Sequence, residues 1–190
     1  MPTSPTASPR GGVFRLGERR PRIHPTAYIA PGAVVAGDVE LGEQVSVWPG
    51  CVLRGDYGRI AVGARTNIQD GTVIHATATL ATVLGADVVV GHGARLEGCV
   101  VEDAALIGMG AIVLHQARIG SGALVAAGAV VTPRTEVPPG ALASGVPARI
   151  SPADSPDAAE AKASAHRTVS ENYAANAQYW MEELRPLERD

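Results

Sequence analysis

The sequence predicts an all-β fold, a parallel β-helix of about six triangular coils, followed by one C-terminal α-helix. Two features of the 190-residue chain lead to this prediction. The first is a strict period of six between aliphatic residues. The second is a composition with 22 Gly, 14 Pro and only 4% aromatic residues, a bias typical of a repeat of short strands and tight corners. A helix returns apolar residues every three or four positions and a plain strand every two, so neither explains a period of six.

Aliphatic residues follow this period over most of the chain. They are Ile29, Val35, Leu41, Val47, Leu53, Val62, Ile68, Ile74, Leu84, Val90, Leu96, Val101, Ile107, Val113, Ile119, Val125, Val131 and Val137. Gly follows directly at 42, 63, 85, 91, 108 and 120, as expected where corners need a permissive backbone. The pattern resembles the hexapeptide repeat of the left-handed parallel β-helix, in which three six-residue sides close each coil. An ordinary Val-rich sandwich would not hold one phase for so long.

The chain divides into three parts. Residues 1–21 are expected to form a disordered N-terminal arm, because MPTSPTASPRGG offers little to bury. Residues 22–150 form the β-helix domain. Residues 151–190 form a linker and a helix packed on the prism, with Ser155 as N-cap and Pro156 as first helical residue. The expected apolar stripe of this helix consists of Val169, Tyr173, Trp180 and Leu184.

Charge and composition exclude several classes of partner. The formal charge of −3 argues against a nucleic acid or an acidic membrane surface. No apolar run approaches the length of a membrane span, and the first residues lack the apolar core of a secretory signal, so we expect a cytoplasmic protein. Cys51 and Cys99 are too few for a disulfide framework, and we expect buried thiols.

Three breaks in the period lie beside the polar residues. Nine residues separate Leu53 from Val62 and ten separate Ile74 from Leu84, so we expect loops to protrude at both places. The step after Leu96 is shortened to five. Such interruptions are where a rigid scaffold usually carries its function.

Counting the aliphatic residues in threes assigns polar side chains to faces of the prism. Because side chains alternate along a strand, Arg54, His75 and Glu97 should form an outward column, with neighbours about 5 Å apart. Gln69 projects from the adjacent face. Asp70 and His92 stack one coil apart near a corner of that face.

Two histidines and a carboxylate can hold one metal ion. His75 and Glu97 share a face, whereas His92 lies round a corner of the same prism. Three prisms around a threefold axis would set the His75 face of one subunit against the His92 face of the next. We therefore expect a homotrimer with a two-His, one-Glu site in each interface.

Several motifs resemble those of the γ-class carbonic anhydrases and their bacterial homologues. They are SVWPGCVLRGD (46–56), TNIQDGTVIH (66–75), VGH (90–92), GC (98–99) and LIGMGAIVL (106–114). The resemblance covers about residues 22–150. It implies a metal bound by three histidines across a trimer interface, with Zn²⁺ expected and Fe²⁺ or Co²⁺ as alternatives. It also implies that metal-bound hydroxide attacks carbon dioxide to give bicarbonate.

The resemblance carries over to the metal ligands with one departure. His75 and His92 match two of the three histidines, but the third falls on Glu97, where the family reads LHGC and this chain LEGC. A carboxylate oxygen is an established zinc ligand. It donates more charge than imidazole, so the bound water should be less acidic and the activity weak or altered. The alternative is that the site has lost tight metal binding.

The resemblance also assigns the surrounding polar residues. Asn67 and Gln69 match residues that bond to the metal-bound water. Arg54, Asp56 and Asp70 match a polar network at the interface.

Proton transfer and the remaining histidines have weaker support. The family carries glutamates in its loops, whereas HATATLAT has no acid, which leaves Asp56 and Tyr57 as the nearest substitutes. His115 lies one coil beyond Glu97 and could flank the site, although a solvated surface histidine is the favoured interpretation. His166 is also expected on the surface.

Three other functions stay open at this point. The same hydroxide could act on a small ester or thioester, which would make the protein a metal-dependent hydrolase. The repeat also occurs in coenzyme A-dependent acyltransferases, in which His75 would serve as general base. The third is a non-catalytic trimeric scaffold.

Overall fold

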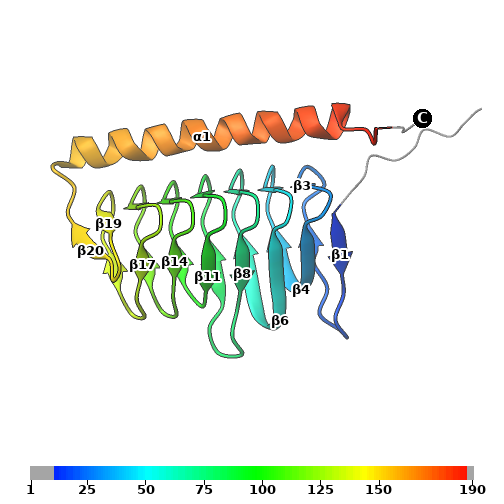
Figure 1. The fold of residues 1–190 in the computed structure, drawn as a ribbon, viewed down its shortest axis with the longest axis horizontal. Helices are drawn as coiled ribbons and strands as arrows, with labels where there is room; N and C mark the ends of the chain where they lie inside the picture. Colours follow the sequence, from blue (N-terminus) through cyan, green and yellow to red (C-terminus); the bar gives the residue numbers. More distant parts are fainter. Residues whose placement is uncertain (1–10, 188–190) are drawn as a thin grey trace, which may run out of the picture.

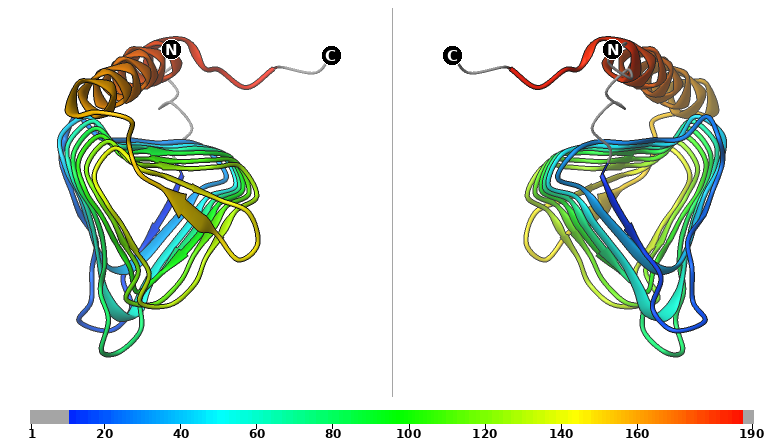
Figure 2. Two further views of the ribbon diagram at one scale, coloured as in Figure 1. Left: turned by 90° about the vertical axis from the view of Figure 1, so that its left-hand side faces the viewer. Right: turned by 90° about the vertical axis from the view of Figure 1, so that its right-hand side faces the viewer.

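The computed structural model describes residues 11–187, which form a three-sided β-prism with one long helix outside it. Viewed along its axis, the prism has a triangular cross-section (Figure 2). The predicted fold class, a left-handed parallel β-helix, is confirmed, with about seven turns rather than about six. Ile23 and Ala143 continue the spacing of six beyond both ends of the predicted series. Together with Val13, the register partner of Val35, these residues account for the additional turn.

Two sheets build the three sides. One side is an eight-stranded sheet of β3 (Tyr28–Ile29), β5 (Ser46–Val47), β7 (Asn67–Ile68), β10 (Val89–Val90), β13 (Leu106–Ile107), β16 (Leu124–Val125), β19 (Leu142–Ser144) and β20 (Arg149–Ser151). The other two sides form a twelve-stranded sheet, because β4 (Val34–Leu41) and β6 (Val52–Val62) continue round a corner. Its other strands are β1 (Gly12–Phe14), β2 (Arg22–Ile23), β8 (Val73–His75), β9 (Thr82–Leu84), β11 (Arg95–Glu97), β12 (Val100–Val101), β14 (Ile112–Val113), β15 (Arg118–Ile119), β17 (Val130–Val131) and β18 (Glu136–Val137).

The core is the column of aliphatic side chains inside the prism. Every residue of the predicted series is buried except Ile29, which is half-buried. The glycines that follow these residues have a role other than the predicted one. They do not adopt positive φ; the left-handed residues lie two positions later, as at Arg65 and Gly93. A Cβ on Gly91 would lie 2.7 Å from the Met109 nitrogen, so glycine is required there because successive coils approach closely.

The helix α1 (Pro156–Glu183) begins as predicted, with Ser155 accepting a hydrogen bond from the Ala158 amide at 3.1 Å. It runs back along the prism from the last turns toward the first (Figure 1) and contacts β3, β5, β7 and β10. Within residues 11–187, no helix has the length and hydropathy needed to cross a membrane.

The buried face of α1 differs from the predicted stripe. It consists of Ala163, His166, Ser170 and Ala177, with Tyr173 and Trp180 half-buried. His166, expected on the surface, is buried, and its Nδ1 lies 2.8 Å from the Ala104 carbonyl oxygen. Trp48 makes edge-to-face contacts with Tyr173 and Trp180, which anchor the end of the helix.

The prediction of a disordered arm at residues 1–21 is wrong in the part that the structure describes. From Gly12 onward the chain is ordered, because β1 pairs in parallel with the edge of β4 and satisfies its open hydrogen-bonding groups. The first ten residues of the predicted arm are outside the described residues.

Candidate metal centre

A column of polar side chains runs outward along β6, β8 and β11. His75 is the last residue of β8, and its register partners are Arg54 in β6 and Glu97 in β11. This register is the one that counting the repeats predicts. Because partners in adjacent parallel strands project from the same face, the three side chains stack along the axis of the prism.

Two carboxylates hold the imidazole of His75. Its Nδ1 lies 2.7 Å from Glu97 Oε1, and its Nε2 lies 2.8 Å from Asp56 Oδ1. The Arg54 guanidinium bonds to the other oxygen of Asp56. The ring is therefore fixed from both sides, with only 16% of the His75 side chain exposed.

The same contacts keep both carboxyl groups ionised. The hydrogen bond from His75 lowers the pKa of Glu97 and outweighs partial burial, which opposes it. Burial raises the pKa of Asp56, but the hydrogen bonds from His75 and Arg54 outweigh it, so this pKa is also below its usual value. Two anions beside one imidazole make the face attractive to a cation.

The insertion between Leu53 and Val62 places Asp56 beside His75. This insertion was predicted to protrude as a loop, and that prediction is wrong. It lies within the continuous strand β6, where the pairing with β4 shifts register after Gly37. Tyr57 lies in the same insertion, and its exposed ring contacts the His75 ring edge-on at a centroid distance of 6.3 Å. The second insertion does protrude: residues 76–81 extend beyond a corner of the prism (Figure 2).

His92 lies apart from this column. It follows β10, and its Nδ1 is 2.9 Å from Asp70 Oδ2, with about half of each side chain exposed. Among the residues that the structure describes, no group of three His, Cys, Asp or Glu side chains could hold a metal ion. A single chain thus brings together His75 and Glu97, and separately His92 and Asp70.

Asn67 and Gln69 lie on the side that α1 covers. Asn67 is fully buried and Gln69 is 6% exposed. Gln69 Nε2 donates to Asn67 Oδ1 at 3.1 Å, and Asn67 Nδ2 donates to Ser170 Oγ at 3.2 Å. Within one chain, neither amide is linked to His75.

Two residues beside these groups were missed or undervalued by the sequence reasoning. His115 is more than a surface histidine, because its Nε2 lies 3.4 Å from Glu97 Oε2 and extends the column by one coil. Ser170 contacts Asn67 and was not singled out. The signal for it was its spacing in α1, since Ser170 falls on the same helical face as Tyr173 and Ala177.

The donor atoms suit zinc, but one chain supplies only part of the set. Imidazole nitrogen and carboxylate oxygen are both zinc ligands, at about 2.0–2.2 Å from the ion. His75 and Glu97 are close enough to share an ion if it takes the place of the hydrogen bond between them. Three protein ligands and an open position require a further donor, and His92 of a second subunit is the candidate.

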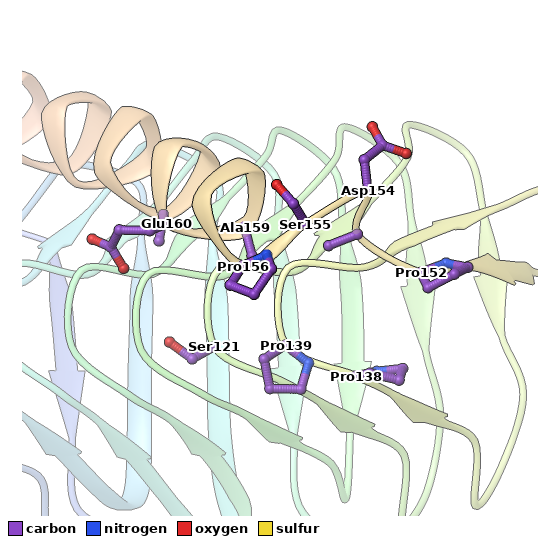
Figure 3. A pocket seen from close by; sticks show the side chains of 11 residues that line it. Ser121, Pro138, Pro139, Pro152, Asp154, Ser155, Pro156, Ala159 and Glu160 are labelled. Carbon is purple, nitrogen blue, oxygen red and sulfur yellow. The ribbon is translucent and has the colours of Figure 1, made fainter.

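Other features of the chain do not compete for this role. A hollow at the start of α1 is lined by prolines, alanines, serines, Asp154 and Glu160, without His or Cys (Figure 3). Cys51 and Cys99 are free thiols inside the core. Burial raises the pKa of Cys51 to about 11 and that of Cys99 to about 12, so neither is a thiolate ligand near neutral pH.

Comparison with known proteins identifies the family. Residues 20–55 and 98–133 match the model described as bacterial transferase hexapeptide (six repeats). The chain is 44% identical over 144 residues to γ carbonic anhydrase 2, mitochondrial, of Arabidopsis thaliana, an alignment that covers 73% of this chain and 52% of that protein. The structure of a hexapeptide transferase family protein from Anaplasma phagocytophilum matches with a TM-score of 0.82 and 35% identity over 89% of this chain and 98% of the other. This chain belongs to the γ-carbonic anhydrase and hexapeptide-repeat family.

This member of the family is also similar to proteins with a transferase description. A candidate acetyltransferase from Bacillus cereus matches with a TM-score of 0.84 and 34% identity, covering 90% of this chain and 96% of the other. The chain spans about half the length of the curated plant relative.

Proposed function

We propose that this chain forms a homotrimeric, metal-dependent enzyme, similar to γ-class carbonic anhydrases, that hydrates carbon dioxide reversibly to bicarbonate. The observation that carries the proposal is the pairing of His75 and Glu97 in register on one face, with His92 exposed at a corner of the adjacent face. The identity to the Arabidopsis protein supports this reaction over others. A cytoplasmic location stays a prediction.

In the proposed site, His75 and Glu97 of one subunit and His92 of the next hold Zn²⁺, with Fe²⁺ or Co²⁺ as alternatives. A bound ion would act as a Lewis acid and make water acidic enough to supply a nucleophile near neutral pH. Glu97 brings negative charge where its relatives' motif has imidazole, so we expect slower hydration than a three-histidine site supports.

The other site residues orient groups and move protons. Asp56, held by Arg54, fixes the ring plane of His75. Asp56 and the exposed Tyr57 keep their predicted role in passing a proton toward solvent, because both contact His75. Gln69 supplies the amide that orients the attacking water, the buried Asn67 holds Gln69 from behind, and Asp70 holds His92.

Metal analysis followed by stopped-flow carbon dioxide hydration tests this proposal on protein purified without chelator. We expect close to one equivalent of metal per subunit, and hydration that His75→Ala and His92→Ala both abolish. Less than about a tenth of an equivalent would contradict the metalloenzyme. Metal without hydration would favour the hydrolase, assayed on small esters and thioesters.

A coenzyme A-dependent acyltransferase is the second candidate, favoured by the similarity to the Bacillus cereus protein. A histidine that bonds to a carboxylate through one nitrogen can act as a general base through the other. In His75, Nδ1 bonds to Glu97 and Nε2 to Asp56, so this role requires Asp56 to release Nε2. Acyl transfer of this kind needs no metal. Consumption of acetyl coenzyme A by chelator-treated protein, lost in His75→Ala, would support it over the carbonic anhydrase.

A further inference from the structure

We propose that Ser170 on α1 is a positioning residue, which sets the orientation of the Gln69 side chain so that its carbonyl oxygen faces the site. This inference rests on the proposed function, in which Gln69 adjoins the attacking water. It assigns α1 a part in the reaction beyond covering one side of the prism. Three consecutive hydrogen bonds link the Asp87 carbonyl, Ser170, Asn67 and Gln69, and their donors and acceptors cannot exchange.

A backbone carbonyl group fixes which atom donates in the first of these hydrogen bonds. Ser170 Oγ lies 3.0 Å from the Asp87 carbonyl oxygen, which can only accept. The hydroxyl therefore donates its single proton there. Ser170 Oγ can then only accept from Asn67, so the Asn67 atom at 3.2 Å must be the amide nitrogen Nδ2.

The orientation of the Asn67 amide determines the orientation of the Gln69 amide. With Nδ2 on Ser170, the oxygen Oδ1 of Asn67 faces Gln69 and can only accept. The Gln69 atom at 3.1 Å is therefore Nε2. Asn67 and Ser170 are fully buried, so turning either amide round would set oxygen against oxygen or nitrogen against nitrogen without water to compensate.

The last group in this series of hydrogen bonds, the Gln69 carbonyl oxygen Oε1, is an acceptor at the surface. No residue within 11–187 donates to Gln69 Oε1. Within residues 11–187, the Tyr28 hydroxyl is the only buried side-chain oxygen or nitrogen without a hydrogen-bond partner. Gln69 Oε1 is not in that class although it has no donor in that part of the chain, so it is accessible at the surface. Gln69 directly precedes Asp70, the partner of His92. This accessible oxygen therefore lies in the same stretch of chain as the Asp70–His92 pair.

An acceptor at this place has a defined effect on a water molecule. It accepts a hydrogen bond from one O–H of the water, so that a lone pair of the water oxygen points toward the carbon under attack. An amide nitrogen in the same place would bind that lone pair instead. Ser170 is itself held in place on α1, since His166 bonds to the Ala104 carbonyl on one side and Tyr173 packs on Trp48 on the other.

The test compares Ser170→Ala with Ser164→Ala, a control at an exposed position on the same helix. Without the hydroxyl, both amides can rotate, so we expect kcat for hydration to fall about tenfold with KM within about twofold. This loss is smaller than for removal of a group that touches the reacting atoms, because Ser170 acts through two others. Ser170→Thr keeps the hydroxyl and should restore kcat, whereas Ser164→Ala should leave it unchanged.

A second measurement does not depend on activity. In ¹H–¹⁵N NMR spectra, the side-chain NH₂ protons of Asn67 and Gln69 should exchange slowly with water in the natural protein and in Ser170→Thr. They should broaden or exchange faster in Ser170→Ala. Ser170→Cys, which keeps the volume but weakens the hydrogen bonds, should lie between and serves if Ser170→Ala does not fold.

The outcomes separate this inference from the proposed function. If hydration and the Gln69 amide signals of Ser170→Ala match those of the natural protein, the positioning role of Ser170 is wrong. If the natural protein does not hydrate carbon dioxide, the proposed function is wrong, and the NMR comparison still decides whether Ser170 orients Gln69.

Discussion

His75 and Glu97 are register partners on β8 and β11, with His75 Nδ1 2.7 Å from Glu97 Oε1. A carboxylate thus stands one coil from the imidazole, where the motif of the relatives would place a third histidine. Three charged or polar neighbours, Asp56, Arg54 and His115, complete the column. The chemistry of the site depends on what Glu97 does in it.

Glu97→His tests whether this carboxylate weakens a carbonic anhydrase. Replacing an anionic ligand by a neutral one should make the metal-bound water more acidic, and each unit of pKa gives about tenfold more hydroxide when the pKa lies above the assay pH. We expect kcat/KM for carbon dioxide hydration at pH 7 to rise by about tenfold, measured by stopped flow at equal metal content. Glu102→Gln, outside the site, is the control. Slower hydration in Glu97→His would show that Glu97 serves another reaction.

Glu97→Gln separates charge from shape. It keeps the volume and one carbonyl oxygen but removes the negative charge that is proposed to bind the ion. We expect metal content after dialysis to fall by at least tenfold, as measured by elemental analysis. Unchanged occupancy would mean that Glu97 is not a ligand and only orients His75.

Burial of His166 predicts a pH dependence of stability. Burial lowers the pKa of His166 below 6.5, so the unfolded state binds the proton more readily than the folded state. The contribution to stability is complete above pH 6.5 and is lost as the pH falls through the folded pKa. His166→Asn, which can still donate to the Ala104 carbonyl oxygen, should flatten this part of the profile.

Urea unfolding of metal-free protein between pH 5 and pH 8 provides the measurement for His166. The free energy of unfolding of the natural protein should decrease below pH 6.5 more than that of His166→Asn. His24→Asn, at the exposed surface, serves as the control. Parallel profiles for the natural protein and His166→Asn would contradict the assignment.

Cys51 and Cys99 should resist alkylation while the protein is folded. Both are buried, and their pKa values are about 11 for Cys51 and about 12 for Cys99. At pH 8 about a thousandth of Cys51 is therefore thiolate, and a smaller fraction of Cys99. Iodoacetamide followed by mass spectrometry should label neither residue in native protein and both in urea. Rapid native labelling would show that the core opens near these residues.

The repeat made most of the fold predictable. A period of six specifies which residues enter the core, and from it follow the register of His75 with Glu97 and the stacking of Asp70 with His92. Counting the aliphatic residues in threes predicts the correct register across both insertions, because each insertion occurs within one step of the repeat.

The sequence revealed less about how the insertions and the helix pack. Asp56 contacts His75 because the first insertion continues as strand β6, which depends on its pairing with β4. The side of the prism that α1 covers depends on the packing of Tyr173 around Trp48. The helical spacing of Ser170 places it on the packed face of α1, but its contact with Asn67, 103 residues apart in the chain, follows only from that docking.

The shared site is the central claim, and subunit mixing tests it most directly. His75→Ala and His92→Ala chains, co-expressed with different tags and purified through both, give only mixed trimers. Around a threefold ring, each mixed trimer contains one interface with both histidines, so we expect about a third of the natural hydration rate and about one metal ion per trimer. Hydration no higher than in either variant alone would contradict a site shared between subunits.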